Sequence, residues 1–373
     1  MKVLLCSPYK EGPDIVRGGI NQWGQNILSY YYNHKKNIEI VPISFDRHVS
    51  LINSKYFFQR IIVGIKEQIN PIHEAIQAIK YIDPDVVHIC TSAGLGCLRD
   101  YLLVRVARNY HKRSVLHLHF GRLPDLAKKK NWEWYLLNAV IKKCDIVIPM
   151  NRPTETALYE NGFSNVKYLP NPLSDNIVDK INSLEGKIMR HPKQLLFVGH
   201  VYETKGVVEL VEGCQNIDGI KLRIVGKYTR EMYNKLLSIC AKSKDTNWIE
   251  FVGEISHEEV LKEFLMADLF VFPSYSEGFP NVILEAMACN CPIIASEVGA
   301  IPEMLDINNF PCGICIQPKS SKEVHDAISS LLNDNQRKEE YAIRAKRRVN
   351  SMYIMPMVWK ELMSIWTIKD IKT

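Results

Sequence analysis

The stretch Glu277-Gly-Phe-Pro-Asn-Val-Ile-Leu-Glu285 places two carboxylates eight positions apart across a predicted junction between a loop and a helix. The apolar run Asp268–Phe272 predicts a strand before this loop. Pro280 suits the first turn of a helix that continues over 281–289. The free N–H groups and the positive dipole end at such a helix start favour a phosphate group lying over residues 278–282.

The two glutamates would then bind the groups on either side of that phosphate. Glu285 would accept hydrogen bonds from a ribose, and Glu277, which precedes the helix, would face the sugar that the phosphate carries. An isolated pair of glutamates is more often solvated or caps a helix. The motifs elsewhere in the chain therefore decide between the two interpretations.

Three such motifs accompany the stretch, and together they resemble retaining glycosyltransferases of family 4, which have the GT-B fold. That family carries two glutamates separated by seven residues, as Glu277 and Glu285 are here. Its other motifs match in the same order at Gly18-Gly19-Ile20, at Val198–Gly206 (VGHVYETKG) and at Glu297–Glu303 (EVGAIPE). The resemblance spans nearly the whole chain. It implies donor binding by Gly18, Gly19, His200, Lys205, Gly278, Phe279, Asn281, Val282 and Glu285.

The chain departs from the family at the predicted phosphate site. In the family, a lysine in the position of Lys205 and an arginine after a glycine bind the donor diphosphate, but here His200 follows Gly199. Arginine offers a permanent bidentate clamp, whereas histidine carries a full charge only when it is protonated. We therefore expect Lys205 to supply more of the leaving-group stabilisation, with Arg17 and Lys227 as candidate further cations.

Three histidines lie on strand-like segments of the first half. His119 ends the run Ser114–His119, where its side chain would face a cleft, and the resemblance places a histidine there close to the reacting sugar. His117 has the same parity but lies deeper, and we expect it, like His88, to be a core histidine. The predicted catalytic residues are therefore His119, Glu277 and Lys205.

Short apolar runs separated by helical segments predict an α/β fold with two Rossmann-like, doubly wound domains. The resemblance implies that they face each other across a cleft and that a C-terminal helix, over 352–366, crosses back to the first domain. We expect an acceptor-binding domain over 1–175 together with 352–373, a linker over 169–192, and a nucleotide-sugar-binding domain over 190–351. The predicted strands are Lys2–Cys6, Asp85–Cys90, Ser114–His119, Asp145–Pro149, Gln194–Val198, Lys221–Val225, Trp248–Val252, Asp268–Phe272 and Pro292–Ala295.

Composition agrees with an ordinary globular protein that has room for two cores, because the chain has 373 residues, of which 46% are hydrophobic and 24% charged. Neither opening strand is followed by G-x-G-x-x-G, which disfavours a dinucleotide-binding dehydrogenase. No apolar run approaches the roughly 20 residues that span a bilayer, and the N-terminus lacks the pattern of a secretory signal. We therefore expect a protein that is cytoplasmic or bound at the inner face of the cell membrane.

No metal or other cofactor is expected. The ten cysteines should be reduced and packed, although Cys289, Cys291, Cys312 and Cys315 imitate the halves of a zinc site. We also expect no Asp-x-Asp triad of the kind that holds a metal in transferases of the other major fold. Cationic side chains and helix dipoles would then stabilise the departing diphosphate. The resemblance implies front-face attack, in which a phosphate oxygen takes the acceptor's proton and no protein nucleophile is needed.

The acceptor is less directly indicated. Lys128-Lys-Lys130 lies beside Trp132, Trp134 and Tyr135, which together with a net charge of +6 favours an anionic membrane surface as a partner. The same residues also describe an amphipathic helix with a solvated basic end. The patterns HLHFG (117–121) and LPNPLS (169–174) resemble the branch that extends surface polysaccharides on a lipid carrier.

The sequence thus predicts a retaining glycosyltransferase of surface polysaccharide biosynthesis. The expected partners are a nucleotide-sugar donor, with a UDP-sugar favoured, and a saccharide or lipid-linked saccharide acceptor. Nucleic acid is not expected, since the basic residues are dispersed. The alternatives are a nucleotide-sugar 2-epimerase of the same fold and an inactive sugar-nucleotide binding module.

Overall fold

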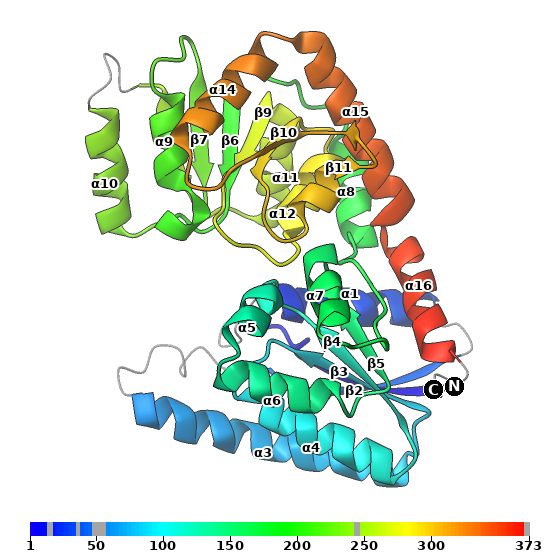
Figure 1. Ribbon diagram of the computed structural model, residues 1–373. Coiled ribbons are helices and arrows are strands. Elements are labelled where there is room, and N and C mark those ends of the chain that lie inside the picture. Colours follow the sequence, from blue (N-terminus) through cyan, green and yellow to red (C-terminus); the bar gives the residue numbers. More distant parts are fainter. Residues whose placement is uncertain (13–17, 35–37, 47–56, 242–246, 369–373) are drawn as a thin grey trace. The chain divides into compact units, whose positions relative to one another are not determined.

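The chain forms two compact units, Met1–Pro172 with Val358–Thr373, and Leu173–Met357. The computed structural model describes residues 1–12, 18–34, 38–46, 57–241 and 247–368, and only the backbone of 57–67. Each unit is built on its own parallel sheet with helices on both faces (Figure 1). This is the α/β architecture that the alternation of apolar runs and helical segments predicts.

The first unit has a sheet of five parallel strands in the order β2-β1-β3-β4-β5. Because side chains alternate along a strand, Val87 and Ile89 of β3 join the main core with helices α3, α4 and α6, whereas His88 and Cys90 lie on the opposite face. The elements are β1 (Lys2–Ser7), α1 (Gly19–His34), β2 (Glu39–Ser44), α3 (Phe57–Tyr81), β3 (Val86–Thr91), α4 (Gly96–Asn109), β4 (Arg113–Leu118), α5 (Leu123–Lys129), α6 (Trp132–Ile141), β5 (Ile146–Pro149) and α7 (Arg152–Glu160).

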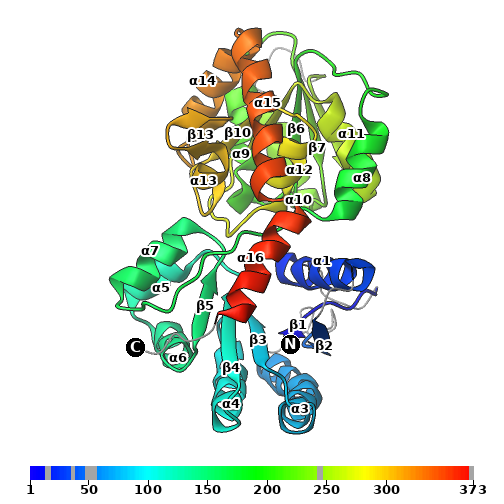
Figure 2. The same ribbon diagram turned by 90° about the vertical axis from the view of Figure 1, so that its right-hand side faces the viewer.

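That opposite face is covered by α1 and by the C-terminal helix α16 (Met355–Thr367), as Figure 2 shows. Trp23 of α1 stacks on His88, with ring centroids 5.4 Å apart, and Trp366 of α16 contacts the same histidine at 5.7 Å. The Arg113 guanidinium donates to the Trp366 carbonyl at 2.7 Å. These contacts tie the end of the described chain to the first sheet.

The second unit has six parallel strands in the order β13-β10-β9-β6-β7-β8 and a separate two-stranded hairpin, β11-β12. Ligands of such open sheets bind beyond the carboxyl ends of the strands. The elements are α8 (Asp175–Leu184), β6 (Gln194–Val198), η1 (Glu203–Lys205), α9 (Val207–Cys214), β7 (Lys221–Val225), α10 (Arg230–Cys240), β8 (Ile249–Gly253), α11 (His257–Met266), β9 (Leu269–Phe272), α12 (Asn281–Ala288), β10 (Ile293–Ser296), α13 (Ile301–Leu305), β11 (Asp306–Ile307), β12 (Phe310–Pro311), β13 (Ile314–Ile316), α14 (Ser321–Leu332) and α15 (Asn335–Met352).

The segment 169–192 is not simply a linker. It contains α8, whose Ile181 is buried in the second unit, so this unit begins at Leu173 and not near residue 190. Near the C-terminal end of the second unit, helix α15 ends at Met352. Backbone hydrogen bonds join Leu173 to Tyr353 (2.7 Å) and Met355 (3.0 Å). These bonds keep the chain in the second unit until Met357.

Candidate functional site

Two loops of the second unit, one after β6 and one after β9, are joined by backbone contacts. The Tyr275 N–H donates to the Thr204 carbonyl at 2.9 Å. Gly206 has φ +71°, and a Cβ at this position would lie 1.9 Å from the Pro273 carbonyl oxygen. Only glycine accommodates both the conformation and the close approach. The two loops therefore have a fixed spacing next to the carboxyl ends of neighbouring strands.

This spacing brings together two of the predicted catalytic side chains. The Lys205 ammonium and Glu277 Oε1 are 2.5 Å apart, and their side chains are 27% and 12% exposed. The same ammonium lies 5.6 Å from the centre of the Phe272 ring. The sequence assigned Lys205 to the diphosphate and Glu277 to the sugar without indicating that they contact each other. In the structure each one neutralises the other.

The motif 297–303 packs against the backbone of the loop that carries Glu277. The Ala300 N–H donates to the Gly278 carbonyl at 3.0 Å. A Cβ on Gly299, which has φ +57°, would lie 2.2 Å from the Glu277 carbonyl oxygen. This motif therefore positions the backbone that carries the glutamate.

Helix α12 begins directly after that loop. Pro280 is its N-cap residue, with extended backbone and no side-chain cap. Phe279 is buried and packs edge-on against Tyr353, with centroids 5.7 Å apart, whereas Asn281 and Val282 are half-buried. With no cap side chain over the N-terminal turn, a ligand anion is a suitable partner for its N–H groups.

Glu285 lies in the second turn of α12 and is buried. Its Oε1 accepts a hydrogen bond at 3.0 Å from Nε2 of His257, the first residue of α11. The bond to Glu285 raises the pKa of His257 above its ordinary value, against the opposing effect of burial. No sequence signal indicated His257.

The histidine that replaces the family's arginine is exposed. The His200 ring stacks on Tyr202, with ring centroids 5.6 Å apart. The preceding residue, Gly199, lies so close to Gly226 that a Cβ on Gly226 would be 2.0 Å from the Gly199 carbonyl oxygen. Of the two candidate further cations, Lys227 is exposed just after β7. Arg17 lies outside the described residues.

The remaining predicted site residues belong to the first unit. Gly18 and Gly19 are exposed at the start of α1, and a Cβ on either would meet nothing within 4 Å. His119 directly follows β4 and is half-buried, but both of its ring nitrogens are buried and lack a hydrogen-bond partner in the described part of the chain. Burial lowers the pKa of His119 to about 3. It is therefore a neutral imidazole.

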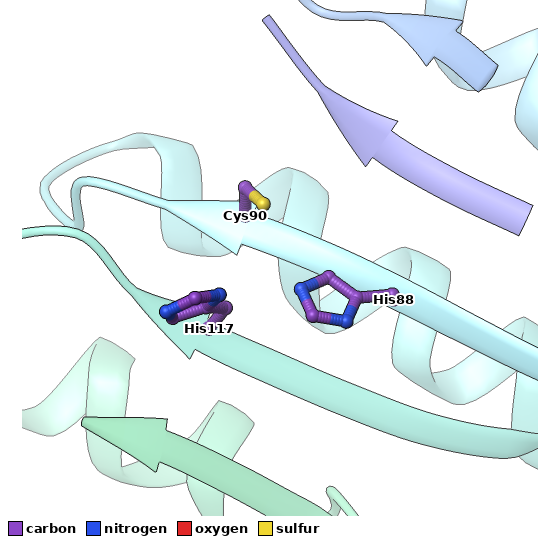
Figure 3. Close-up of side chains that lie close together, drawn as sticks. All are labelled: His88, Cys90 and His117. Atoms are coloured by element: carbon purple, nitrogen blue, oxygen red, sulfur yellow. The ribbon is translucent and has the colours of Figure 1, made fainter. Parts of the chain in front are cut away.

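His88, Cys90 and His117 form a buried group whose potential ligand atoms all lie within 4.8 Å of one another (Figure 3). However, His88 Nδ1 accepts a hydrogen bond from the Trp366 indole N–H at 3.0 Å. The neutral ring then carries its own proton on Nε2, which leaves neither nitrogen a free lone pair for a metal. Burial also raises the pKa of the Cys90 thiol. Both histidines are core residues, as predicted.

Two other motifs of metal-binding type, a set of cysteines and an Asp-x-Asp triplet, make contacts within the protein. Cys289, Cys291 and Cys312 are buried free thiols that donate to backbone carbonyls of their surroundings. Contrary to expectation, an Asp-x-Asp triplet does occur, at Asp83-Pro-Asp85. It precedes β3, at the opposite end of the strand from the carboxyl edge. There Asp85 accepts from the Lys2 N–H at 2.7 Å and Asp83 pairs with Lys112 at 2.5 Å.

Sequence comparisons match the chain to known glycosyltransferases. Residues 180–348 match the family described as glycosyl transferases group 1. The chain is 32% identical to a putative teichuronic acid biosynthesis glycosyltransferase, TuaC, from Bacillus subtilis, over 39% of this chain and 35% of that protein. It is 24% identical to the capsular polysaccharide biosynthesis glycosyltransferase CapM from Staphylococcus aureus, over 74% of each. The alignments to TuaC and to two Methanocaldococcus jannaschii glycosyltransferases span less than half of those proteins.

Solved structures match over the whole chain. HepE from Anabaena, determined in complex with UDP, superposes with a TM-score of 0.70 at 16% identity and covers 98% of this chain and 99% of its own. The galactosyltransferase WaaB of the lipopolysaccharide outer core superposes with a TM-score of 0.65 at 16% identity, covering 98% and 99%. At these identities the likeness establishes the fold, which is GT-B with two Rossmann-like domains. Residues 180–348 thus match the group 1 glycosyl transferases, and the chain as a whole has the fold of GT-B glycosyltransferases.

Proposed function

We propose that this protein is a retaining glycosyltransferase that moves a sugar from a UDP-sugar to a saccharide or lipid-linked saccharide in surface polysaccharide biosynthesis. The observation that carries the proposal is the Lys205–Glu277 ion pair beside the uncapped start of α12. A cation and the N-terminal end of a helix suit a diphosphate, and an adjacent carboxylate suits sugar hydroxyls. The solved complex of HepE with UDP-glucose supports a nucleotide-sugar donor.

In this proposal the donor replaces the internal ion pair. The diphosphate binds the Lys205 ammonium and the first turn of α12, which releases the Glu277 carboxylate to accept hydrogen bonds from the sugar. Glu285 accepts from the ribose, and His200 adds a donor to the diphosphate. Charge that develops on the departing diphosphate is stabilised by these groups without a metal.

The first unit carries the remaining predicted site residues, His119 and the glycine pair. His119 is a neutral imidazole and not a cation. Because both of its ring nitrogens are buried, its ring would have to turn before it could hydrogen-bond a sugar. The N–H groups at the start of α1, beside Gly18 and Gly19, are suited to a phosphate oxygen or an acceptor oxygen. The departing phosphate oxygen takes the acceptor's proton, so that no protein nucleophile is required.

Incubating the protein with a panel of UDP-, GDP- and ADP-sugars tests this assignment. Slow release of free sugar and UDP from one UDP-sugar is the expected result. A changed sugar on intact nucleotide would instead indicate an epimerase, and binding without turnover an inactive module. Release with GDP- or ADP-sugars alone would overturn the choice of base.

We also propose that the first unit binds an anionic membrane surface, where a lipid-linked acceptor would be available. Leu95, Leu98, Trp132 and Tyr135 are between 55% and 61% exposed. They lie at the starts of α4 and α6, which are joined because the Gly94 N–H donates to Glu133 Oε1 at 2.8 Å. These four side chains form an apolar patch, which we call the α4–α6 patch.

Charge favours an anionic bilayer as the occupant of the α4–α6 patch. Lys128, Lys129 and Lys130 are exposed directly before α6. Of the two acidic side chains close to them in the sequence, Glu133 is paired with Arg122 at 2.5 Å, and Asp125 is exposed in the first turn of α5. Apolar side chains beside several lysines are the combination that binds the surface of anionic membranes. None of the described helices is both long enough and apolar enough to cross a bilayer.

Vesicle flotation tests the membrane proposal. The wild-type chain should float with vesicles of phosphatidylcholine and phosphatidylglycerol and less with phosphatidylcholine alone. Trp132→Ser/Tyr135→Ser should abolish flotation, whereas Met189→Ser, at an 82% exposed site in the second unit, should not. If the wild type floats with neither vesicle, or the double variant floats like the wild type, the proposal is wrong.

A further inference from the structure

The residue that contacts the buried glutamate of α12 has no role in the family motifs. His257 begins α11, after the N-cap Ser256, and its side chain is 44% exposed. The Glu285 side chain is only 9% exposed. The bond from His257 Nε2 to Glu285 Oε1, at 3.0 Å, is the one hydrogen bond of this carboxylate within the described residues. One carboxylate oxygen is therefore engaged and the other is available.

This bond decides how the carboxylate is presented. The terminal torsion of a glutamate is broad, so an unanchored carboxylate rotates among many orientations. A carboxylate with so little exposure also needs hydrogen bonds to remain charged at low cost. His257 supplies a donor that fixes one oxygen and thereby directs the other.

Charged groups on three helices surround His257. His257 is faced by Glu285 on α12 and by Lys180 on α8. Glu258 and Glu259 follow His257 on its own helix. A positive charge in the first turn of a helix is normally disfavoured. The pKa of His257 is nevertheless raised, because the bond to Glu285 outweighs burial and the Lys180 charge.

We propose that His257 is a positioning residue that holds Glu285 Oε1 so that Glu285 Oε2 accepts a hydrogen bond from a ribose hydroxyl of the donor. This role rests on the proposed function, in which Glu285 binds the ribose of the donor. His257 itself need not touch the ligand. Its effect is therefore confined to nucleotides that carry ribose hydroxyls.

Calorimetric titration with UDP, with 2′,3′-dideoxy-UDP and with inorganic pyrophosphate tests the proposal. His257→Ala should weaken UDP about tenfold, the effect of losing one hydrogen bond to a charged group. It should leave dideoxy-UDP and pyrophosphate unchanged. His257→Gln, whose amide N–H reaches the same place, should bind UDP within about twofold of wild type. His325→Ala removes a comparable histidine, bonded to the Gly213 carbonyl, and should change nothing.

Kinetics and one further variant separate the possible failures. In hydrolysis of a UDP-sugar, His257→Ala should raise KM and leave kcat within about twofold. Glu285→Gln should weaken UDP but not dideoxy-UDP. If Glu285→Gln leaves UDP binding unchanged, the proposed ribose site fails and this inference fails with it. If Glu285→Gln weakens UDP and His257→Ala does not, or weakens dideoxy-UDP equally, the positioning role alone is wrong.

Discussion

Replacing Lys205 by alanine should remove most of the turnover of a UDP-sugar while the protein stays folded. The ammonium is 2.5 Å from Glu277 Oε1 and is proposed to meet the departing diphosphate. Loss of one positioned group that stabilises such charge typically lowers the rate about 10²- to 10³-fold. The assay measures the release of UDP from the UDP-sugar in the absence of an acceptor, and a coupled enzyme reaction detects the UDP.

The stability cost of this change follows from the exposure of the pair. Exposed ion pairs contribute about 0.2–1 kcal/mol, and breaking a buried pair costs about 3–5 kcal/mol. With side chains 27% and 12% exposed, Lys205→Ala should cost about 1–2 kcal/mol, or a few degrees in Tm. Lys205→Ala/Glu277→Ala should be more stable than the sum of the single changes implies, because no carboxylate is left unpaired.

The matched control is Lys235→Ala. Lys235 pairs with Glu203 at 3.0 Å, but these side chains are 44% and 60% exposed. This variant should cost less than about 1 kcal/mol and keep full turnover. Glu277→Gln should bind UDP more tightly than wild type, because the diphosphate no longer competes with a carboxylate for Lys205, yet should turn over the UDP-sugar poorly. Near-normal turnover in Lys205→Ala, or a loss no larger than in Lys235→Ala, would refute the reasoning.

Three further predictions concern pH, a glycine and metal. Because the pKa of His257 is raised, its bond to Glu285 contributes fully to stability below the ordinary histidine pKa, and this contribution is lost as the pH rises through the raised pKa. Tm measured against pH should show this loss in the wild type and not in His257→Gln. Gly299→Ala, with its Cβ directed at the Glu277 carbonyl, should abolish turnover and lower Tm, whereas Gly186→Ala, which has φ +76° but open space, should lower Tm slightly and keep activity. Turnover should survive EDTA, and activity that returns only with Mg²⁺ would contradict the metal-free mechanism.

The sequence predicted the sheets well because their central strands are continuous apolar runs. Each predicted strand is present, with its ends shifted by at most one residue. The missed elements lie at edges and turns. Strand β2 contains Pro42 and lies at the edge of its sheet, where proline is tolerated. The β11-β12 hairpin turns at Asn308 and Asn309, both with positive φ, a turn signal that could have been recognised.

The site was predictable as a set of residues but not as a set of contacts. The motif spacing indicated Lys205, Glu277 and Glu285, because each motif follows a strand on the same edge of one sheet. That Lys205 pairs with Glu277 depends on two loops 72 residues apart, and no local pattern reports it. The bond from His257 to Glu285 likewise joins two helices. In the sequence, the residues around His257 indicate only the capped start of a helix.

A crystal structure of the protein with bound UDP tests the central claim most directly. The account predicts the diphosphate against the Lys205 ammonium and the N–H groups that begin α12, with a ribose hydroxyl within hydrogen-bond distance of Glu285 and His257 still bonded to that carboxylate. UDP bound at another place on the chain, with the Lys205–Glu277 pair intact, would contradict it.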